Sequence, residues 1–157
     1  MRFVLSVALV GLVACVGCGS SKLPHPQEKA IAAIEALGGY VSVDKNGAAW
    51  AVGFGDTKDT DAVLIHLKGL TKLSHLHLDS TKVTDAGLVH LNELTNLELL
   101  DLYQTKITDA GLEHLKGLTN LEKLDLTDTN VTDVGIKKLQ KALPNCAMGN
   151  GSITPTR

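Results

Sequence analysis

The feature that most constrains the fold is a 24-residue segment that the chain repeats without a gap. Residues 73–96 read LSHLHLDSTKVTDAGLVHLNELTN, and residues 97–120 read LELLDLYQTKITDAGLEHLKGLTN. A third copy, LEKLDLTDTNVTDVGIKKLQKALPN, follows at residues 121–145. Self-similarity at such a period predicts a solenoid, in which each unit buries its apolar face only against its neighbours.

Two apolar periodicities follow one another within each copy. Leu76 and Leu78 alternate with polar residues, which is the spacing of a half-buried strand. Leu88, Leu91 and Leu94 recur every three residues, which predicts a helix. Each unit is therefore expected to contain one strand followed by one helix.

The residues T-D-x-G mark the start of each expected helix. Thr84 would be the N-cap residue, and Asp85 would lie at the positive end of the helix dipole. Gly87 costs helix propensity, so we interpret it as a close-packing position. Thr81 lies where the chain leaves the strand, and its hydroxyl can bond backbone groups inside a tight bend. The next two units repeat these positions as Thr105, Thr108, Asp109 and Gly111, and as Thr129, Thr132, Asp133 and Gly135.

The full pattern, L-x-x-L-x-L-x-x-T-x-[VI]-T-D-x-G-[LI]-x-x-L, resembles a leucine-rich repeat with Thr where Asn or Cys is usual. It is similar to the repeats of the ribonuclease-inhibitor-like and F-box-associated groups, and closer to short arrays in bacterial envelope proteins. The resemblance implies an α/β fold: a short solenoid with parallel strands on the concave face and helices on the convex face.

The segment before the three copies is expected to contain a cap and a degenerate first unit. Residues 26–37 predict a helix, and the turn signal at residues 46–47 predicts a hairpin whose return strand runs from Ala48 to Phe54. Counting back 24 residues from Leu76 reaches Val52, so this return strand is also the first unit. We therefore assign residues 26–48 to the cap and 49–148 to the array, with Met148 in a closing stub, and 149–157 to a flexible tail. Trp50 is interpreted as cap packing, with ligand stacking as the alternative.

The first 25 residues predict targeting rather than folded structure. Residues 1–14 combine a basic start with an apolar run too short for a permanent membrane span, as in a signal peptide. The sequence Leu12-Val13-Ala14-Cys15 resembles a bacterial lipobox, which implies cleavage before Cys15 and its lipidation. Residues 15–25 would then be a tether, and the protein a membrane-anchored lipoprotein facing the periplasm or exterior. The alternatives are a plain secretory signal, or Cys18 as the lipidated residue.

Composition excludes some classes of partner. The net charge is −2 and aromatic residues make up 3% of the chain, so neither a basic surface nor stacking platforms for nucleic acid are expected. Cys18 and Cys146 are not in metal-ligand spacing and are expected to be free thiols.

No catalytic constellation is recognisable in the sequence. The column formed by His66, His90 and His114 places one imidazole on each helix, and packed helices lie about 8–10 Å apart, too far to share a zinc ion. No nucleophile is paired with a His by motif, and no Gly-rich loop follows a strand. We expect no enzyme activity, cofactor, metal or small-molecule substrate.

The remaining candidate site is the set of strand positions that point away from the core. These positions vary between copies while the packing framework does not, which suits a binding surface. The candidate partner-binding residues are His75, His77, Asp79, Leu99, Asp101, Tyr103, Lys123 and Asp125. The equivalents in the first unit are Ala51, Gly53 and Gly55. The alternative is an exposed strand face that binds nothing.

The sequence thus predicts a non-catalytic protein-interaction module, anchored to the bacterial cell envelope by a lipidated Cys15, that contacts a protein or cell-wall component. One alternative is a passive structural or self-associating envelope protein. Another is a substrate-receptor domain like those with F-box-associated repeats, although no F-box precedes the array.

Overall fold

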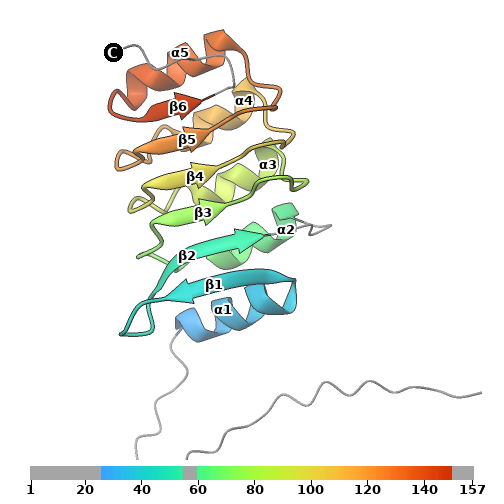
Figure 1. Cartoon of the computed structure of the whole chain (residues 1–157), viewed down its shortest axis with the longest axis vertical. Helices are drawn as coiled ribbons and strands as arrows, with labels where there is room; N and C mark the ends of the chain where they lie inside the picture. Colours follow the sequence, from blue (N-terminus) through green and yellow to red (C-terminus); the bar gives the residue numbers. More distant parts are fainter. Residues whose placement is uncertain (1–25, 55–59, 150–157) are drawn as a thin grey trace, which may run out of the picture.

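Six strands form one sheet in chain order, and the helices cover one of its faces (Figure 1). The computed structural model describes residues 26–54 and 60–149, so the predicted signal peptide, Cys15, the tether and residues 150–157 lie outside the described residues. The strands are β1 (Gly39–Val43), β2 (Ala49–Phe54), β3 (His75–His77), β4 (Leu99–Asp101), β5 (Lys123–Asp125) and β6 (Ala147–Gly149). The helices are α1 (Pro26–Ala36), α2 (Thr60–Leu64), α3 (Asp85–Leu88), α4 (Asp109–Leu112) and α5 (Asp133–Ala142), with 3-10 helices η1 (Ile65–Leu67), η2 (Val89–Leu91) and η3 (Glu113–Leu115).

The strand register reproduces the sequence repeat. Strands β2 to β6 are parallel, and Leu76 of β3 pairs with Val52 on one side and Leu100 on the other. Leu100 pairs in turn with Leu124, which pairs with Met148. Val52 and Met148 therefore continue the register of the repeats at its two ends, and the predicted α/β repeat fold is confirmed.

The repeated leucines form a continuous core between the sheet and the helices. Leu76 and Leu88 are fully buried, and their counterparts along the array are buried as well. Thr81 and Thr105 are buried beside them, and their hydroxyls donate to the carbonyl oxygens of Leu78 and Leu102 at 2.6 and 2.7 Å. The predicted role of these threonines at the bend is therefore confirmed.

The helical part of each central repeat differs from the prediction. In the second unit the α-helix lasts from Asp85 to Leu88 and tightens into the 3-10 helix η2, which ends at Leu91. A 3-10 helix has three residues per turn, so leucines at every third position keep facing the core. Leu94 lies beyond the helix but remains buried. The helix predicted from the every-third spacing is therefore a short α-helix followed by a 3-10 helix, and it does not extend to Leu94.

The aspartates of T-D-x-G act between repeats, not only at their own helix. Asp85 accepts hydrogen bonds from the backbone N–H of Thr108 at 2.8 Å and from the Thr108 hydroxyl at 2.6 Å. Asp61 and Thr84 make the same pair, as do Asp109 and Thr132. The predicted N-cap bond is absent at Thr84, whereas Thr108 accepts from the backbone N–H of Ala110 at 3.2 Å.

The N-terminal helix and hairpin close the first layer of the core. Strand β1 runs antiparallel to β2, and Ile34 of α1 is fully buried in the same core cluster. Asp44 closes the hairpin turn by accepting from the backbone N–H groups of Ala48 and Asn46. These two bonds hold the pKa of the Asp44 carboxyl below its ordinary value.

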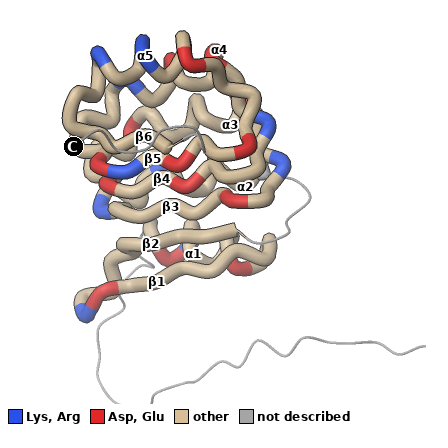
Figure 2. Tube along the Cα trace, turned by 45° about the horizontal axis from the view of Figure 1, so that its top comes forward, with Lys and Arg blue, Asp and Glu red and all other residues tan. Residues whose placement is uncertain are grey.

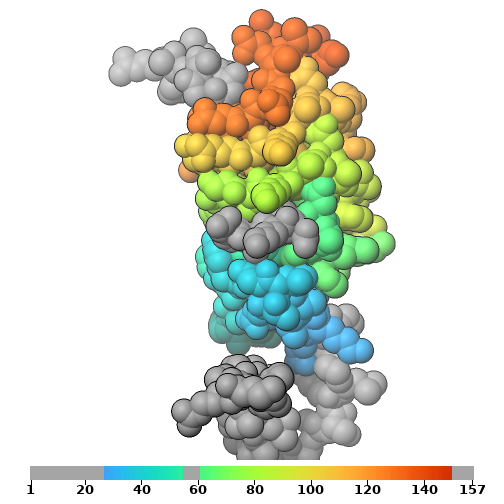
Figure 3. Space-filling view, turned by 90° about the vertical axis from the view of Figure 1, so that its right-hand side faces the viewer, coloured from blue at the N-terminus to red at the C-terminus, as the bar shows by residue number. Residues whose placement is uncertain are grey.

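The repeats lie in consecutive bands along the long axis. Figure 3 shows the described residues ordered from the N-terminal end to the C-terminal end, so that each unit mainly contacts its sequence neighbours. Among the described helices, none is long and apolar enough to cross a membrane.

Candidate functional site on the sheet face

The sheet face is the surface of β1–β6 opposite the helices. Strand pairing forms one row in the order His75, Leu99, Lys123. It forms a second row in the order His77, Asp101, Asp125. Asp79 and Tyr103 come two residues after the ends of β3 and β4. The structure therefore brings all eight predicted partner-binding residues onto adjacent strands of the sheet face or the loops directly after them.

The first unit does not expose the residues that the sequence predicted there. Ala51 is only 5% exposed and Gly53 is buried. The ring of Tyr40 from the neighbouring strand β1 covers Gly53, because a Cβ atom on this glycine would lie 2.1 Å from the ring. Gly55 lies outside the described residues. Tyr40 is 54% exposed, so its side chain forms the surface of the sheet face in this unit.

A bulge in the hairpin adds a second aromatic ring. The register of β1 against β2 shifts between Ser42 and Val43 and skips Trp50. The Trp50 ring packs edge-on against the imidazole of His75, with ring centroids 5.4 Å apart and planes at 83°. Trp50 is 42% exposed and its ring contacts His75 of the following unit, whereas the sequence favoured packing within the cap. A bulge is not readable from these residues, which is why the sequence did not place Trp50 beside His75.

The imidazole of His75 is also held from its own strand. Its Nδ1 lies 2.8 Å from the hydroxyl oxygen of Ser74, and that hydroxyl donates to the carbonyl oxygen of Trp50 at 3.1 Å. The Ser74 hydroxyl and His75 Nδ1 are therefore hydrogen-bond partners, and the tautomer of His75 decides which of them donates. In the described part of the chain no carboxylate forms an ion pair with His75, and the contact with Ser74 positions the ring.

The centre of the sheet face is acidic. Asp101 accepts from the backbone N–H of Tyr103 at 3.0 Å, and Asp125 accepts from that of Thr127 at 2.8 Å, so both carboxylates are fixed by tight turns. Within residues 26–54 and 60–149, no Lys or Arg nitrogen lies within 4.0 Å of the carboxylates of Asp79, Asp101 or Asp125. Figure 2 shows the acidic positions along β4 and β5. Among the described residues, the basic partner near this centre is therefore His77, whose Nδ1 lies 3.9 Å from Oδ2 of Asp101, and not a Lys or Arg.

The C-terminal half of the sheet face contains an open depression of about 330 Å³. Its walls combine apolar atoms with carboxylates and an ammonium group, a mixture suited to holding one side chain of another molecule. Its lining includes His77, Leu99, Asp101, Lys123, Asp125, Ala147 and Gly149. The sequence did not predict the contribution of β6, because the stub was interpreted only as a cover for the core.

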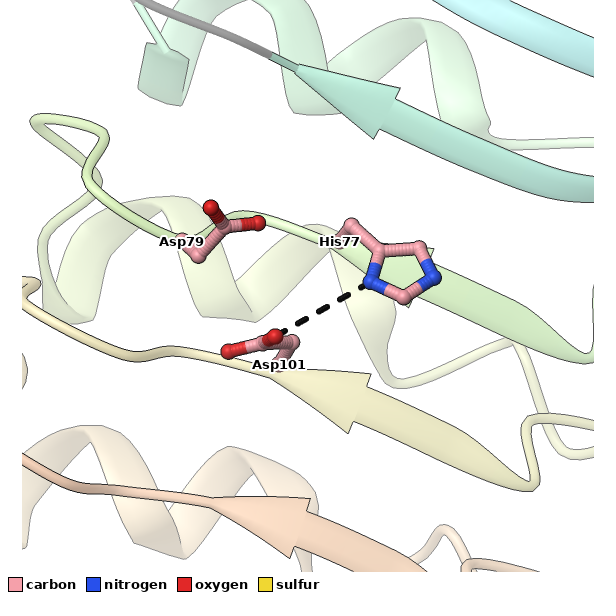
Figure 4. Close-up of side chains that lie close together, drawn as sticks. All are labelled: His77, Asp79 and Asp101. Carbon is pink, nitrogen blue, oxygen red and sulfur yellow. Dashed lines mark ion pairs between the residues drawn. The ribbon is translucent and has the colours of Figure 1, made fainter.

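The histidines on the helix side stay apart from this face. His66, His90 and His114 lie in η1, η2 and η3, one in each repeat. A different set converges on the sheet face, where potential ligand atoms of His77, Asp79 and Asp101 all lie within 4.8 Å of one another (Figure 4). The sequence repeat points only to the helical column, because His77, Asp79 and Asp101 do not form a column of period 24.

Comparisons with known proteins agree with the repeat register. A family model described as leucine-rich repeats in two copies matches residues 95–145, and a model of a single leucine-rich repeat matches residues 69–91. A search of curated proteins finds no match. Among solved structures, the chain is similar to an internalin (inlF) from Listeria monocytogenes, with 19% identity and a TM-score of 0.43.

That similarity covers 67% of this chain and 35% of the internalin chain, so the chain spans about a third of the internalin's length. The two family models match the segments in which the parallel register and the buried leucines repeat. Residues 69–91 and 95–145 are therefore similar to leucine-rich repeats, a type of repeat that typically forms protein-interaction modules.

Proposed function

We propose that the chain is a non-catalytic interaction module of the bacterial cell envelope that binds a protein or cell-wall partner through its sheet face. The observation that carries this proposal is the contrast between the two faces of each strand. Core positions repeat the same apolar residue, whereas sheet-face positions change from His to Leu to Lys and from His to Asp to Asp. Because packing does not determine the second set, it is free to serve recognition.

The chemistry of the sheet face defines the kind of partner. Tyr40 and Trp50 expose aromatic surface at the N-terminal end, and Leu99 adds apolar surface at the centre. Asp101 and Asp125 provide carboxylates that have no Lys or Arg nitrogen within 4.0 Å among the described residues. A segment with an apolar group and a Lys or Arg side chain would satisfy both, since Tyr and Trp are common interface anchors and complementary charge favours encounter.

The envelope location rests on the resemblance of Leu12-Val13-Ala14-Cys15 to a lipobox. Several acyl chains on Cys15 would hold the domain stably at a membrane, whereas one chain alone binds marginally. A Cys15→Ser variant should move the protein from the membrane fraction to the soluble fraction, and Cys18→Ser serves as the matched control. Equal fractionation of Cys15→Ser and the parent protein would contradict the anchor.

Affinity capture from detergent-solubilised envelope would test the binding face. The purified protein is compared with a triple variant in which His77, Leu99 and Tyr103 are changed to Ser. The control is Val134→Ser, because Val134 is 60% exposed on α5 and lies off the sheet face. All three proteins must show the same circular dichroism and denaturation midpoint.

A partner that binds the parent protein and the Val134 variant, but not the triple variant, is the expected result. Equal capture by all three folded proteins would favour a passive structural or self-associating role. In that case, concentration-dependent sedimentation of the purified protein would identify self-association. Capture of a ubiquitin-ligase component would favour the substrate-receptor alternative.

A further inference from the structure

One imidazole and two carboxylates converge at a single place on the sheet face. His77 and Asp101 are cross-strand partners in β3 and β4, and Asp79 lies two residues beyond His77. Figure 4 shows His77 and Asp101 pointing toward one another, with Asp79 beside them. The Nδ1 atom of His77 lies 3.9 Å from Oδ2 of Asp101, and the potential ligand atoms of the three residues lie within 4.8 Å of one another.

We propose that His77, Asp79 and Asp101 bind a divalent transition-metal ion of the Zn²⁺ class. An imidazole nitrogen with two carboxylate oxygens is a donor set that Zn²⁺ accepts. Three protein ligands leave coordination positions for water or for a ligand from another molecule. This site does not depend on the identity, or the existence, of a protein partner.

The ligand atoms are close enough to need only side-chain adjustment. Around a tetrahedral Zn²⁺ with bonds of about 2.0 Å, neighbouring ligand atoms lie about 3.3 Å apart. The separations here reach at most 4.8 Å, so each side chain must move by roughly an ångström about its own torsions. His77 and Asp101 are partly exposed, with side-chain exposures of 34% and 28%, which leaves room for that movement.

The carboxylates of Asp101 and Asp79 differ in their neighbouring contacts. The backbone N–H of Tyr103 donates to Oδ1 of Asp101, which leaves Oδ2 on the side of His77. Such an outer hydrogen bond orients a ligand and is part of most metal sites. Within the described ranges, Asp79 has no hydrogen-bond or ion-pair partner, so its carboxylate has no competing contact to give up.

Within the described part of the array, this combination of His and two Asp residues occurs only at β3 and β4. The positions equivalent to His77 are Gly53, Asp101, Asp125 and Gly149, and those equivalent to Asp79 include Tyr103 and Thr127. A structural demand of the repeat would recur in every unit, as the buried leucines do. The two carboxylates also lie side by side without a Lys or Arg within 4.0 Å among the described residues, and a bound cation would offset their repulsion.

The test is Zn²⁺ titration of the full chain, purified in detergent without a polyhistidine tag and stripped with a chelator. Isothermal calorimetry gives the stoichiometry and affinity, and the visible absorption of Co²⁺ reports an inner-sphere site independently. The ligand variants are His77→Ala, Asp79→Asn and Asp101→Asn; the last keeps an oxygen that can accept from the Tyr103 N–H. The matched controls are Asp125→Asn, one repeat further along the same row, and His90→Ala on the helix side.

We expect one saturable Zn²⁺ site per chain. Each ligand variant should weaken it by at least about tenfold, since loss of an outer-shell partner alone typically costs 10–100-fold. The two controls should retain the affinity of the parent protein. Absence of saturable binding up to about 1 mM Zn²⁺ would overturn the proposal. So would binding that survives the Asp79 and Asp101 changes, or that is lost in His90→Ala. None of these outcomes bears on whether the sheet face captures a protein partner.

Discussion

The carboxylate of Asp85 is held by Thr108 of the following repeat, with its Oδ1 atom 2.8 Å from the backbone nitrogen and its Oδ2 atom 2.6 Å from the hydroxyl oxygen. The two residues are 23 positions apart, so this is a contact between units. The same pair recurs between Asp61 and Thr84 and between Asp109 and Thr132. A column of charge-assisted hydrogen bonds therefore joins successive units, beside the sheet and the leucine core.

Changing Asp85 to Ala should lower the free energy of unfolding by about 2–4 kcal/mol. The change removes two hydrogen bonds to a charged group and leaves the Thr108 N–H and hydroxyl without this acceptor. Urea denaturation of the purified protein measures the loss. Asp79→Ala is the control and should stay within about 0.5 kcal/mol, because Asp79 makes no such bond among the described residues. Equal losses in the two variants would contradict the inter-repeat role.

Changing Gly111 to Ala should destabilise the protein although alanine favours helices. A Cβ atom at this position would lie 2.3 Å from Oδ1 of Asp85, closer than any normal contact. The methyl group would therefore push the carboxylate away from Thr108. We expect a loss of about 1–3 kcal/mol, the usual range for overpacking at a tight site.

The same substitution should be tolerated once the carboxylate is gone. In an Asp85→Ala background, the two shortest contacts of the added methyl are gone, and the next is with Ile107 at 3.1 Å. Alanine is worth about 1 kcal/mol more than glycine in a helix, so the added cost of Gly111→Ala should shrink toward zero. The double-mutant cycle by urea denaturation would then show coupling above about 1 kcal/mol. Additive losses would mean that the glycine is required for another reason.

The sequence predicted the repeat fold well because its signals are local and periodic. The 24-residue period sets the strand register, and Leu76 meets Leu100 where the pattern requires it. The bend threonines were also predictable, since Thr81 bonds a carbonyl three residues away. In contrast, the hydrogen bonds that Thr108 donates to Asp85 join two units, and the residue types fit helix capping equally well.

The sheet face was predictable as a set of positions but not as a surface. Alternation places His75 and Asp101 away from the core, but it does not show that Tyr40 covers Gly53. The hairpin bulge that leaves Trp50 against His75 is likewise a backbone event without a distinctive residue. These features arise from contacts of the cap hairpin with the repeat strands. The periodicity within one repeat does not encode such contacts.

Leu100 and Leu99 offer a direct test of which strand face is buried. Leu100 is 1% exposed in the core, whereas its neighbour Leu99 is half-buried on the sheet face. Leu100→Ala should cost about 2–5 kcal/mol, the usual loss when a buried leucine leaves a cavity. Leu99→Ala should cost well under half as much, because the site remains open to solvent. Denaturant midpoints at constant slope would measure both, and a larger loss for Leu99 would reverse the assigned faces.

Acid should weaken the contact between Asp109 and Thr132. The Thr132 hydroxyl, followed by its backbone N–H, holds the pKa of the Asp109 carboxyl below its ordinary value. A carboxyl whose pKa is lower in the folded state contributes stability above its unfolded pKa of about 3.9, and this contribution is lost as the pH falls through the folded pKa. The stability difference between the parent protein and Asp109→Asn should therefore be largest near neutral pH and should shrink below about pH 4.

Urea denaturation between pH 7 and pH 3 measures this stability difference. Thr132→Val is the control: it removes the hydroxyl donor and should also flatten the pH dependence. A difference that stays constant down to pH 3 would show that the carboxylate charge does not contribute to this contact.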